Sequence, residues 1–178
     1  MRLLAMLAAA ALPGNAQGPQ FSPVAIGEAI AYFRHICVET LPDPSAFAAA
    51  LAADTSGWTR HEKSTRRVTV LGHFWSSPRG ELSYVNLPGV QWPETNPGCH
   101  YAFRTGPEFD HDSASRALAA ALRIDGGRQT RDRREQQTRW EVVLPSGLRV
   151  RIFLSTAERD MGGPAATLSI SAYRRQSR

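Results

Sequence analysis

Residues 139–155, which read RWEVVLPSGLRVRIFLS, give the clearest indication of the fold. Two runs of strand-forming residues flank Pro145-Ser146-Gly147, a combination typical of a tight turn. In the second run, apolar side chains alternate with arginines and a phenylalanine, so one face of this strand is fully aliphatic. That face carries Leu148, Val150, Ile152 and Leu154. We therefore predict a β-hairpin with one face in a core.

Further strands are predicted upstream and downstream of this hairpin. Residues 67–76 and 81–87 alternate in the same way around a Ser77–Gly80 turn, which predicts another hairpin. Residues 99–105 and 166–174 each predict a single strand. Because short turns join consecutive strands, the strand pairs should be antiparallel.

Three segments have helical periodicity. Residues 24–38 carry an apolar face and follow Ser22-Pro23, a favourable helix start. Asp43-Pro44 predicts a second helix that continues to about residue 53. Residues 110–124 predict a third helix, with acidic residues at its start and Gly126-Gly127 at its end. Leu118 and Leu122 lie on the apolar stripe of that helix.

Together these elements predict an α+β fold. An antiparallel sheet of about six strands, made of two hairpins plus single strands, would pack against two or three amphipathic helices. The length of 178 residues, with 42% hydrophobic and 21% charged residues, is typical of one globular domain. No internal repeat of fixed period is evident.

The first sixteen residues resemble a secretory signal peptide in their composition. A charged start, Met1-Arg2, precedes ten consecutive apolar residues from Leu3 to Leu12, and Pro13-Gly14 then breaks any helix. Ten residues rise only about 15 Å as a helix, roughly half the thickness of a bilayer, so a membrane span is disfavoured. An ordinary buried helix is the remaining alternative. We expect residues 1–16 to be removed and residues 17–178 to form a single domain that is periplasmic or secreted.

Two cysteines, Cys37 and Cys99, remain after that removal. In an exported protein an even cysteine count favours a disulfide. Two free thiols and a catalytic thiol are the alternatives. Cys99 is followed by His100, but neighbours on a strand point to opposite faces, so they are poorly placed to act as a nucleophile and its base.

The formal net charge is +5, and Lys63 is the only lysine among 21 basic residues. Such arginine usage is common in GC-rich bacterial genomes, so it is weak evidence for binding. The candidate binding residues are Arg131, Arg133 and Arg134 in a polar stretch, and Trp92 in a proline-rich loop. Aromatic residues are not interleaved with the arginines, and export removes the protein from nucleic acids, so no nucleic-acid partner is expected.

Local motifs for catalysis are lacking. The sequence has no nucleophile elbow, paired-histidine zinc helix, glycine-rich phosphate loop or CxxC. Asp110-His111-Asp112 could contribute metal ligands, but carboxylates at a helix start serve as caps, and that interpretation is favoured. We predict no catalytic residue, no metal and no cofactor.

Three functions are consistent with these observations. The first is an exported, non-enzymatic globular domain that binds a partner protein or a cell-envelope component. The second is a small hydrolase with dispersed acid–base residues, for which Asp110, His111 and His100 are the candidates. The third is an arginine-rich, polyanion-binding protein of the envelope.

Overall fold

The computed structural model describes residues 21–61, 73–85, 97–132, 135–159 and 163–173. The helical elements are α1 (Ile26–Phe33), a π-helical turn η1 (Arg34–Val38), α2 (Pro44–Ala53) and α3 (His111–Leu122). The strands are β1 (Thr59–His61), β2 (His73–Ser77), β3 (Gly80–Val85), β4 (Gly98–Arg104), β5 (Arg128–Arg131), β6 (Glu135–Val143), β7 (Arg149–Arg159) and β8 (Gly163–Ala172).

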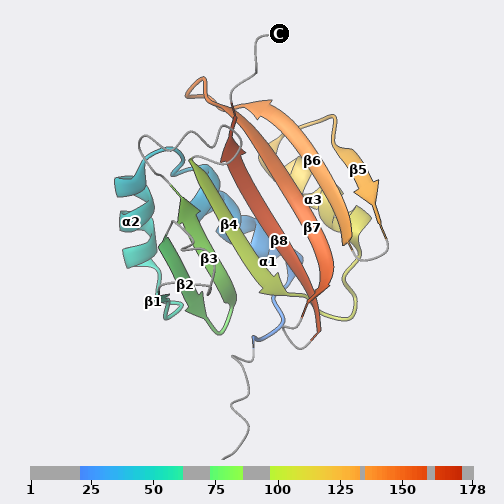
Figure 1. The fold of residues 1–178 in the computed structure, drawn as a ribbon, viewed down its shortest axis with the longest axis horizontal. Coiled ribbons are helices and arrows are strands. Elements are labelled where there is room, and N and C mark those ends of the chain that lie inside the picture. The colour runs from blue at the N-terminus through green and yellow to red at the C-terminus, as the bar shows by residue number, and fades with distance from the viewer. Residues whose placement is uncertain (1–20, 62–72, 86–96, 133–134, 160–162, 174–178) are drawn as a thin grey trace, which may run out of the picture.

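All eight strands form one antiparallel sheet in the order β1-β2-β3-β4-β8-β7-β6-β5, which confirms the α+β class. Two four-stranded meanders, β1–β4 and β5–β8, meet where β4 pairs with β8 (Figure 1). At the middle of this central pair, Tyr101 lies opposite Leu168.

The described sheet has more strands than the sequence predicts. The additional strands, β1 and β5, lie at its two edges. Both are short, and all four residues of β5 are exposed. An edge strand with no buried face has no apolar alternation, so the pattern that predicts strands is absent there.

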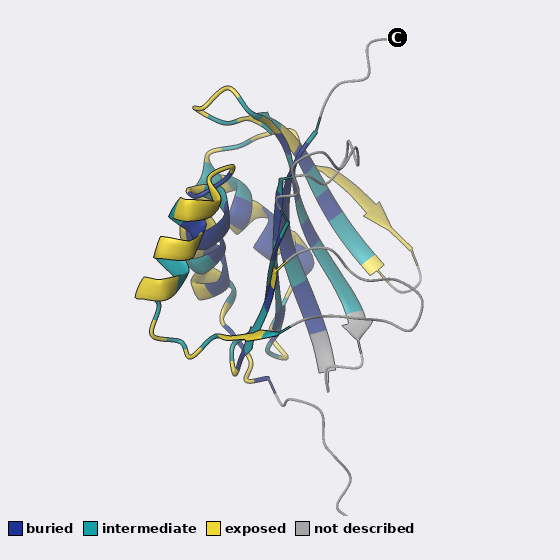
Figure 2. Ribbon diagram, turned by 60° about the vertical axis from the view of Figure 1, so that its left-hand side comes forward, coloured by how far each residue is buried: buried dark blue, intermediate teal, exposed yellow. Residues whose placement is uncertain are grey.

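The helices of the described chain cover one face of the sheet (Figure 2). Residues that pair from strand to strand across the sheet have their side chains on the same face. In one such row the side chains point toward the helices: Trp75, Leu82, Tyr101, Leu168, Leu154 and Thr138. The last five of these are buried, and Trp75 packs on Phe47 of α2. The core therefore lies between this face and the helices.

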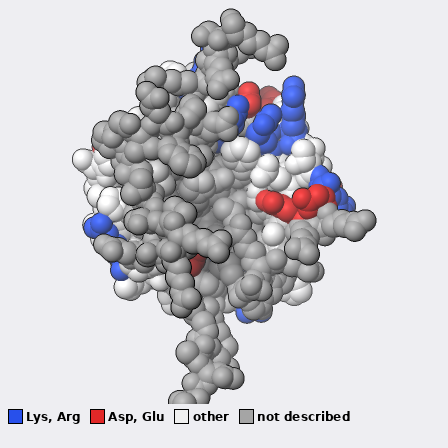
Figure 3. All heavy atoms as spheres, viewed as in Figure 1, with Lys and Arg blue, Asp and Glu red and all other residues white. Residues whose placement is uncertain are grey.

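The opposite face of the sheet, here called the open face, carries the alternate residues. The adjacent row across it contains Ser83, His100, Ser169, Phe153 and Arg139. On this face, basic side chains gather over the strands from β5 to β7 (Figure 3).

The predicted start of the first helix is wrong. Pro23 forms a bridge with Arg104, and the Val24 N–H donates to the Arg104 carbonyl oxygen at 3.0 Å. The chain around Ser22-Pro23 is therefore extended beside the sheet, and α1 starts at Ile26 without a side-chain cap. Asp43 does cap α2 as predicted, since its carboxylate accepts the Ser45 N–H at 2.8 Å.

The first helix also changes its geometry along its length. A single helix was expected over 24–38, but α1 gives way to the π-helical turn η1, which contains Cys37. Cys37 forms a disulfide with Cys99 of β4, and their Cα atoms are 5.4 Å apart. The predicted pairing is confirmed, and it is consistent with an oxidising compartment.

The β2–β3 turn shows why glycine ends the predicted Ser77–Gly80 segment. Gly80 has φ of +142°, and a Cβ there would collide with the carbonyl oxygen of Ala102 on β4. Only glycine combines that backbone conformation with so close an approach.

Among the described helices, none has the length and apolar character needed to cross a membrane.

Candidate functional site

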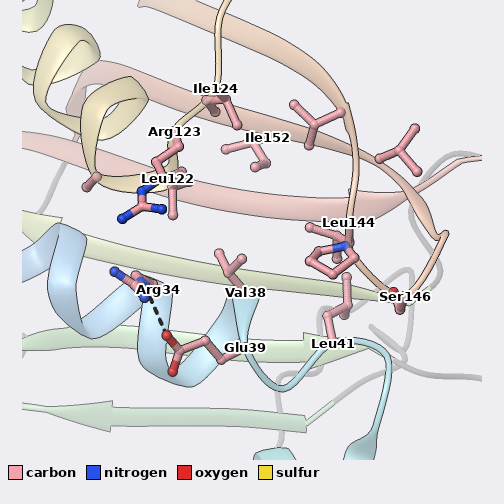
Figure 4. Close-up of a pocket in the computed structure, with 14 residues that line it drawn as sticks. Arg34, Val38, Glu39, Leu41, Leu122, Arg123, Ile124, Leu144, Ser146 and Ile152 are labelled. Atoms are coloured by element: carbon pink, nitrogen blue, oxygen red, sulfur yellow. Dashed lines mark hydrogen bonds and ion pairs between the residues drawn. The ribbon is translucent and has the colours of Figure 1, made fainter.

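A pocket opens where η1 and α3 end above the sheet, beside the turn that joins β6 to β7 (Figure 4). Its volume is about 630 Å³, within the range of about 300–1,000 Å³ that is usual for small-molecule sites. Three segments far apart in the sequence line it. They are residues 34–41 (Arg34, Val38, Glu39 and Leu41), residues 121–124, and the hairpin residues 142–146 with Ile152.

The pocket has an apolar interior and a polar rim. Leu41 and Ile152 are buried, and the half-buried lining residues are Val38, Leu122, Ile124, Val142 and Leu144. The charged and hydroxyl side chains that line it, Arg34, Glu39, Arg123 and Ser146, are all exposed. Such an arrangement suits a ligand with an apolar body and a polar end.

The α3 wall ends in a Schellman motif. The Ile124 N–H donates to the Ala119 carbonyl at 3.0 Å, and the Arg123 N–H donates to the Ala120 carbonyl at 3.2 Å. Arg123 takes the left-handed conformation, with φ of 54°, at the position where glycine is usual. The helix was predicted to stop at Gly126-Gly127, but it stops at Arg123, and this turn directs Leu122, Arg123 and Ile124 to the pocket.

The hairpin wall is held by its turn. The Leu144 N–H donates to the Leu148 carbonyl at 2.9 Å, and the Gly147 N–H donates to the Leu144 carbonyl at 2.8 Å. Val143 is 59% exposed, the highest value for a large apolar side chain in the described part of the chain. Val143 lies four residues after Arg139 on β6 and pairs with Arg149, so its exposed side chain points to the open face of the sheet.

The rim carries more positive than negative charge. Glu39 accepts from Arg34 Nε at 2.9 Å, and its second oxygen lies 3.4 Å from His35 Nδ1. These exposed pairs contribute little to stability. Arg123 forms no ion pair or side-chain hydrogen bond with any residue that the structure describes. The rim thus presents a cation with no described counter-ion.

Of the predicted binding residues, only Arg131 lies within the described residues. It is the exposed last residue of β5, and it does not line the pocket. Arg133, Arg134 and Trp92 lie outside the described residues. The sequence therefore pointed to a region different from the pocket.

Other arginines of the polar stretch and of β7 form a basic area, defined by Arg128, Arg139, Arg149 and Arg151, on the open face (Figure 3). Glu141 lies among them and accepts from Arg151 Nε at 3.2 Å. Although burial opposes the change, the bond from Arg151 and the positive charge of Arg139 lower the pKa of Glu141. Arg128 and Arg149 have no described ion pair.

The residues proposed for a hydrolase are not brought together. Cys99 and Tyr101 face the helices, so His100 between them lies on the open face, where burial lowers its pKa. His111 lies on the other side of the sheet, in contact with Thr138 and Thr156. The sheet therefore separates the two histidines.

Asp110 and Asp112 both have structural roles. Asp110 caps α3, because its carboxylate accepts the Ser113 N–H at 2.7 Å, and these hydrogen bonds to Ser113 lower its pKa. Asp112 accepts from the side-chain amides of Gln129 and Gln136. The cap interpretation is thus confirmed for Asp110, and the described residues contain no group of three or more potential ligands that could hold a metal ion.

A second cluster of titratable groups lies at the far end of the helix layer. The Arg79 guanidinium pairs with Glu28 and sits 5.5 Å from the centre of the Tyr32 ring. Asp54 accepts from the Trp58 indole N–H at 2.8 Å. Burial, followed by the nearby Asp54, raises the pKa of Tyr32. Arg79 is paired with Glu28 and Asp54 with Trp58, so we interpret the cluster as packing.

Comparisons with protein-family models, curated proteins and solved structures found no match.

The sequence did not predict the pocket residues, because each belongs to a helix or strand whose own apolar pattern already accounts for that residue. The run Val142-Val143-Leu144 is the nearest signal, because three apolar residues in a row cannot all face one side of a strand. It accounts for the exposed Val143 on the open face and does not indicate the pocket.

Proposed function

We propose that this protein is an exported, non-enzymatic binding domain, periplasmic or secreted, whose pocket between α3, η1 and the β6–β7 turn holds an envelope component or part of a partner protein. The observation that carries this proposal is the pocket itself. It has an apolar interior, an open polar rim and a volume of about 630 Å³.

The composition of the pocket supports binding rather than catalysis. Its lining contains two arginines, one glutamate and one serine, and the other residues are apolar. The glutamate, Glu39, is already engaged by Arg34 and His35. No histidine, cysteine or second carboxylate lines it, so it offers no nucleophile with an adjacent base.

Export is supported by the composition of residues 1–16 and by the Cys37–Cys99 disulfide. N-terminal sequencing of protein from its native host tests this part of the proposal. A mature chain that starts at or near Gln17 in an envelope or culture fraction is expected. An intact Met1 on cytosolic protein would exclude export.

Binding can be tested with an uncharged apolar fluorophore, N-phenyl-1-naphthylamine. Its emission should rise on addition of the folded protein, because the probe leaves water for an apolar site. In Ala121→Trp, an indole would occupy the pocket, so the rise should be largely lost. Ala117→Trp is the matched control, since Ala117 is an exposed residue of the same helix that does not line the pocket. Equal signals from both variants would refute this site.

The basic area on the open face favours a second candidate, the binding of a polyanion. Four arginines there face one glutamate, and two of them, Arg128 and Arg149, have no described counter-ion. Binding to anionic vesicles should then weaken steeply between low and moderate salt. Arg128→Ala/Arg149→Ala should reduce it, whereas Ala121→Trp should not. Salt-independent binding would argue against this candidate.

A further inference from the structure

We infer that the pocket takes the apolar chain of a single-chain amphiphile, whose anionic carboxylate or phosphate head group pairs with Arg123. This inference rests on the proposed binding function and specifies its ligand class. It is carried by the charges of the rim, the backbone of Arg123 and the chemistry of the lining.

Glu39 determines the charge balance of the pocket rim. It is the one acidic residue of the lining, and Arg34 already neutralises it through a bond of 2.9 Å. Arg123 is the remaining charge, and it has no described counter-ion. A neutral ligand would leave this cation unmatched, and a cationic ligand would be repelled, whereas an anionic head group matches it.

This cation belongs to a residue whose backbone conformation favours glycine. Arg123 is the one non-glycine residue with positive φ among the residues described. A side chain in the left-handed conformation has a steric cost that glycine avoids. An arginine at this helix end therefore lowers stability, and its guanidinium lies at the pocket rim (Figure 4). Ligand binding gives a physical role to a residue that folding alone does not favour.

The chemistry of the pocket lining favours an acyl chain over a peptide. A bound peptide brings backbone N–H and C=O groups, which are costly to bury without partners. The interior lining, from Val38 and Leu41 to Leu144 and Ile152, consists of hydrocarbon side chains. An acyl chain has no polar group to satisfy below its head group, so it fits this interior better.

The test compares four ligands with the same twelve-carbon chain, below their micelle concentrations. Dodecanoate and dodecyl phosphate are anionic, dodecanol is neutral, and dodecyltrimethylammonium is cationic. Each displaces N-phenyl-1-naphthylamine from the folded protein. We expect the two anions to displace it at roughly tenfold lower concentration than dodecanol, the factor of one charge-assisted hydrogen bond. The cation should be weakest.

Variants then assign the effect to Arg123. Arg123→Gly should remove most of the preference for anions and retain the binding of dodecanol. Its Tm should equal or exceed that of the parent protein, because glycine adopts the left-handed conformation without the steric cost. Arg123→Lys should retain the preference in part. Arg116→Ala, which removes an arginine of the same helix outside the pocket, should leave all four affinities unchanged.

The outcomes distinguish this inference from the proposed function. Equal displacement by all four ligands would overturn the inference and leave the binding pocket in place. Failure of the fluorophore itself to bind would overturn the proposed function. An apolar hexapeptide with a free carboxylate that competes more strongly than dodecanoate would replace the amphiphile with a peptide. An anion preference that survives in Arg123→Gly would also overturn the assignment to Arg123.

Discussion

Cys37 and Cys99 form a disulfide that ties the π-helical turn η1, which contributes to the pocket wall, to β4 at the centre of the sheet. The two residues are 62 positions apart in the chain, and both are fully buried. The bridge therefore fixes the end of the helix layer over the sheet at the side where the pocket opens.

Removal of this disulfide should lower stability substantially. A cross-link across a loop of this length reduces the entropy of the unfolded chain, which contributes about 4 kcal/mol. We expect Cys37→Ala/Cys99→Ala to lose up to that amount in urea titrations, and reduction of the parent protein to have a similar effect. Alkylation of both cysteines in unreduced native protein, detected by mass, would contradict the pairing.

Protonation of His111 should destabilise the fold. Thr156 donates to the Gln136 carbonyl at 3.3 Å, so its oxygen accepts from His111 Nδ1–H at 3.0 Å. The other ring nitrogen, Nε2, then accepts from Thr138 at 2.9 Å, which requires a neutral ring. Burial lowers the pKa of His111, so the unfolded chain binds a proton at a higher pH than the folded protein does.

Stability is therefore expected to fall as the pH drops below about 6.5, the usual histidine value, toward the lowered pKa of the folded state. Burial lowers the pKa of His100 as well, so it contributes a loss of the same sign. Urea titrations at pH 7.5 and 5.5 should show a smaller pH effect in His111→Gln than in the parent protein. His35→Gln, at an exposed site, should retain the full effect. An unchanged pH dependence in His111→Gln would refute this role.

The helix cap predicts unequal effects for two neighbouring aspartates. Asp110 accepts the Ser113 N–H at the start of α3, whereas the partners of Asp112 among the described residues are the side chains of Gln129 and Gln136. Asp110→Ala should lower Tm by a few degrees, as expected for loss of an N-cap. Asp112→Ala should lower it less. Thermal denaturation followed by circular dichroism measures both, and a larger effect at Asp112 would mean that the cap is assigned wrongly.

Replacement by aspartate should destabilise the protein to different extents at two leucines on the apolar stripe of α3. Leu118 is fully buried, whereas Leu122 is half-buried and lines the pocket. Leu118→Asp should cost roughly 4 kcal/mol or more and prevent folding, because it buries an unpaired carboxylate. Leu122→Asp, which the apolar stripe alone predicts to unfold the domain, should cost about 1–2 kcal/mol and abolish binding of the apolar fluorophore. Similar melting of the two variants would place Leu122 in the core.

Local sequence patterns determined most of the secondary structure. The alternation in 139–155 predicted the β6–β7 hairpin, because each strand has one face in the core. Asp43-Pro44 and Asp110 predicted two helix starts. A capping carboxylate accepts a backbone N–H that is only two or three residues further along the chain, so the cap is visible in the local sequence. The cysteine pair was predicted from an even cysteine count and from the composition of residues 1–16, which led us to expect export.

Only the tertiary structure determined the edges of the sheet and the pocket. The edge strands β1 and β5 form through hydrogen bonds to neighbouring strands, and their side chains show no buried face in the sequence. Val38, Leu122 and Leu144 come from three elements, and no local pattern indicates that they meet. The left-handed turn at Arg123 is likewise invisible in a sequence that offers glycines three residues later. Sequence encodes the interactions between near neighbours, whereas a site made by distant segments exists only after the chain has packed.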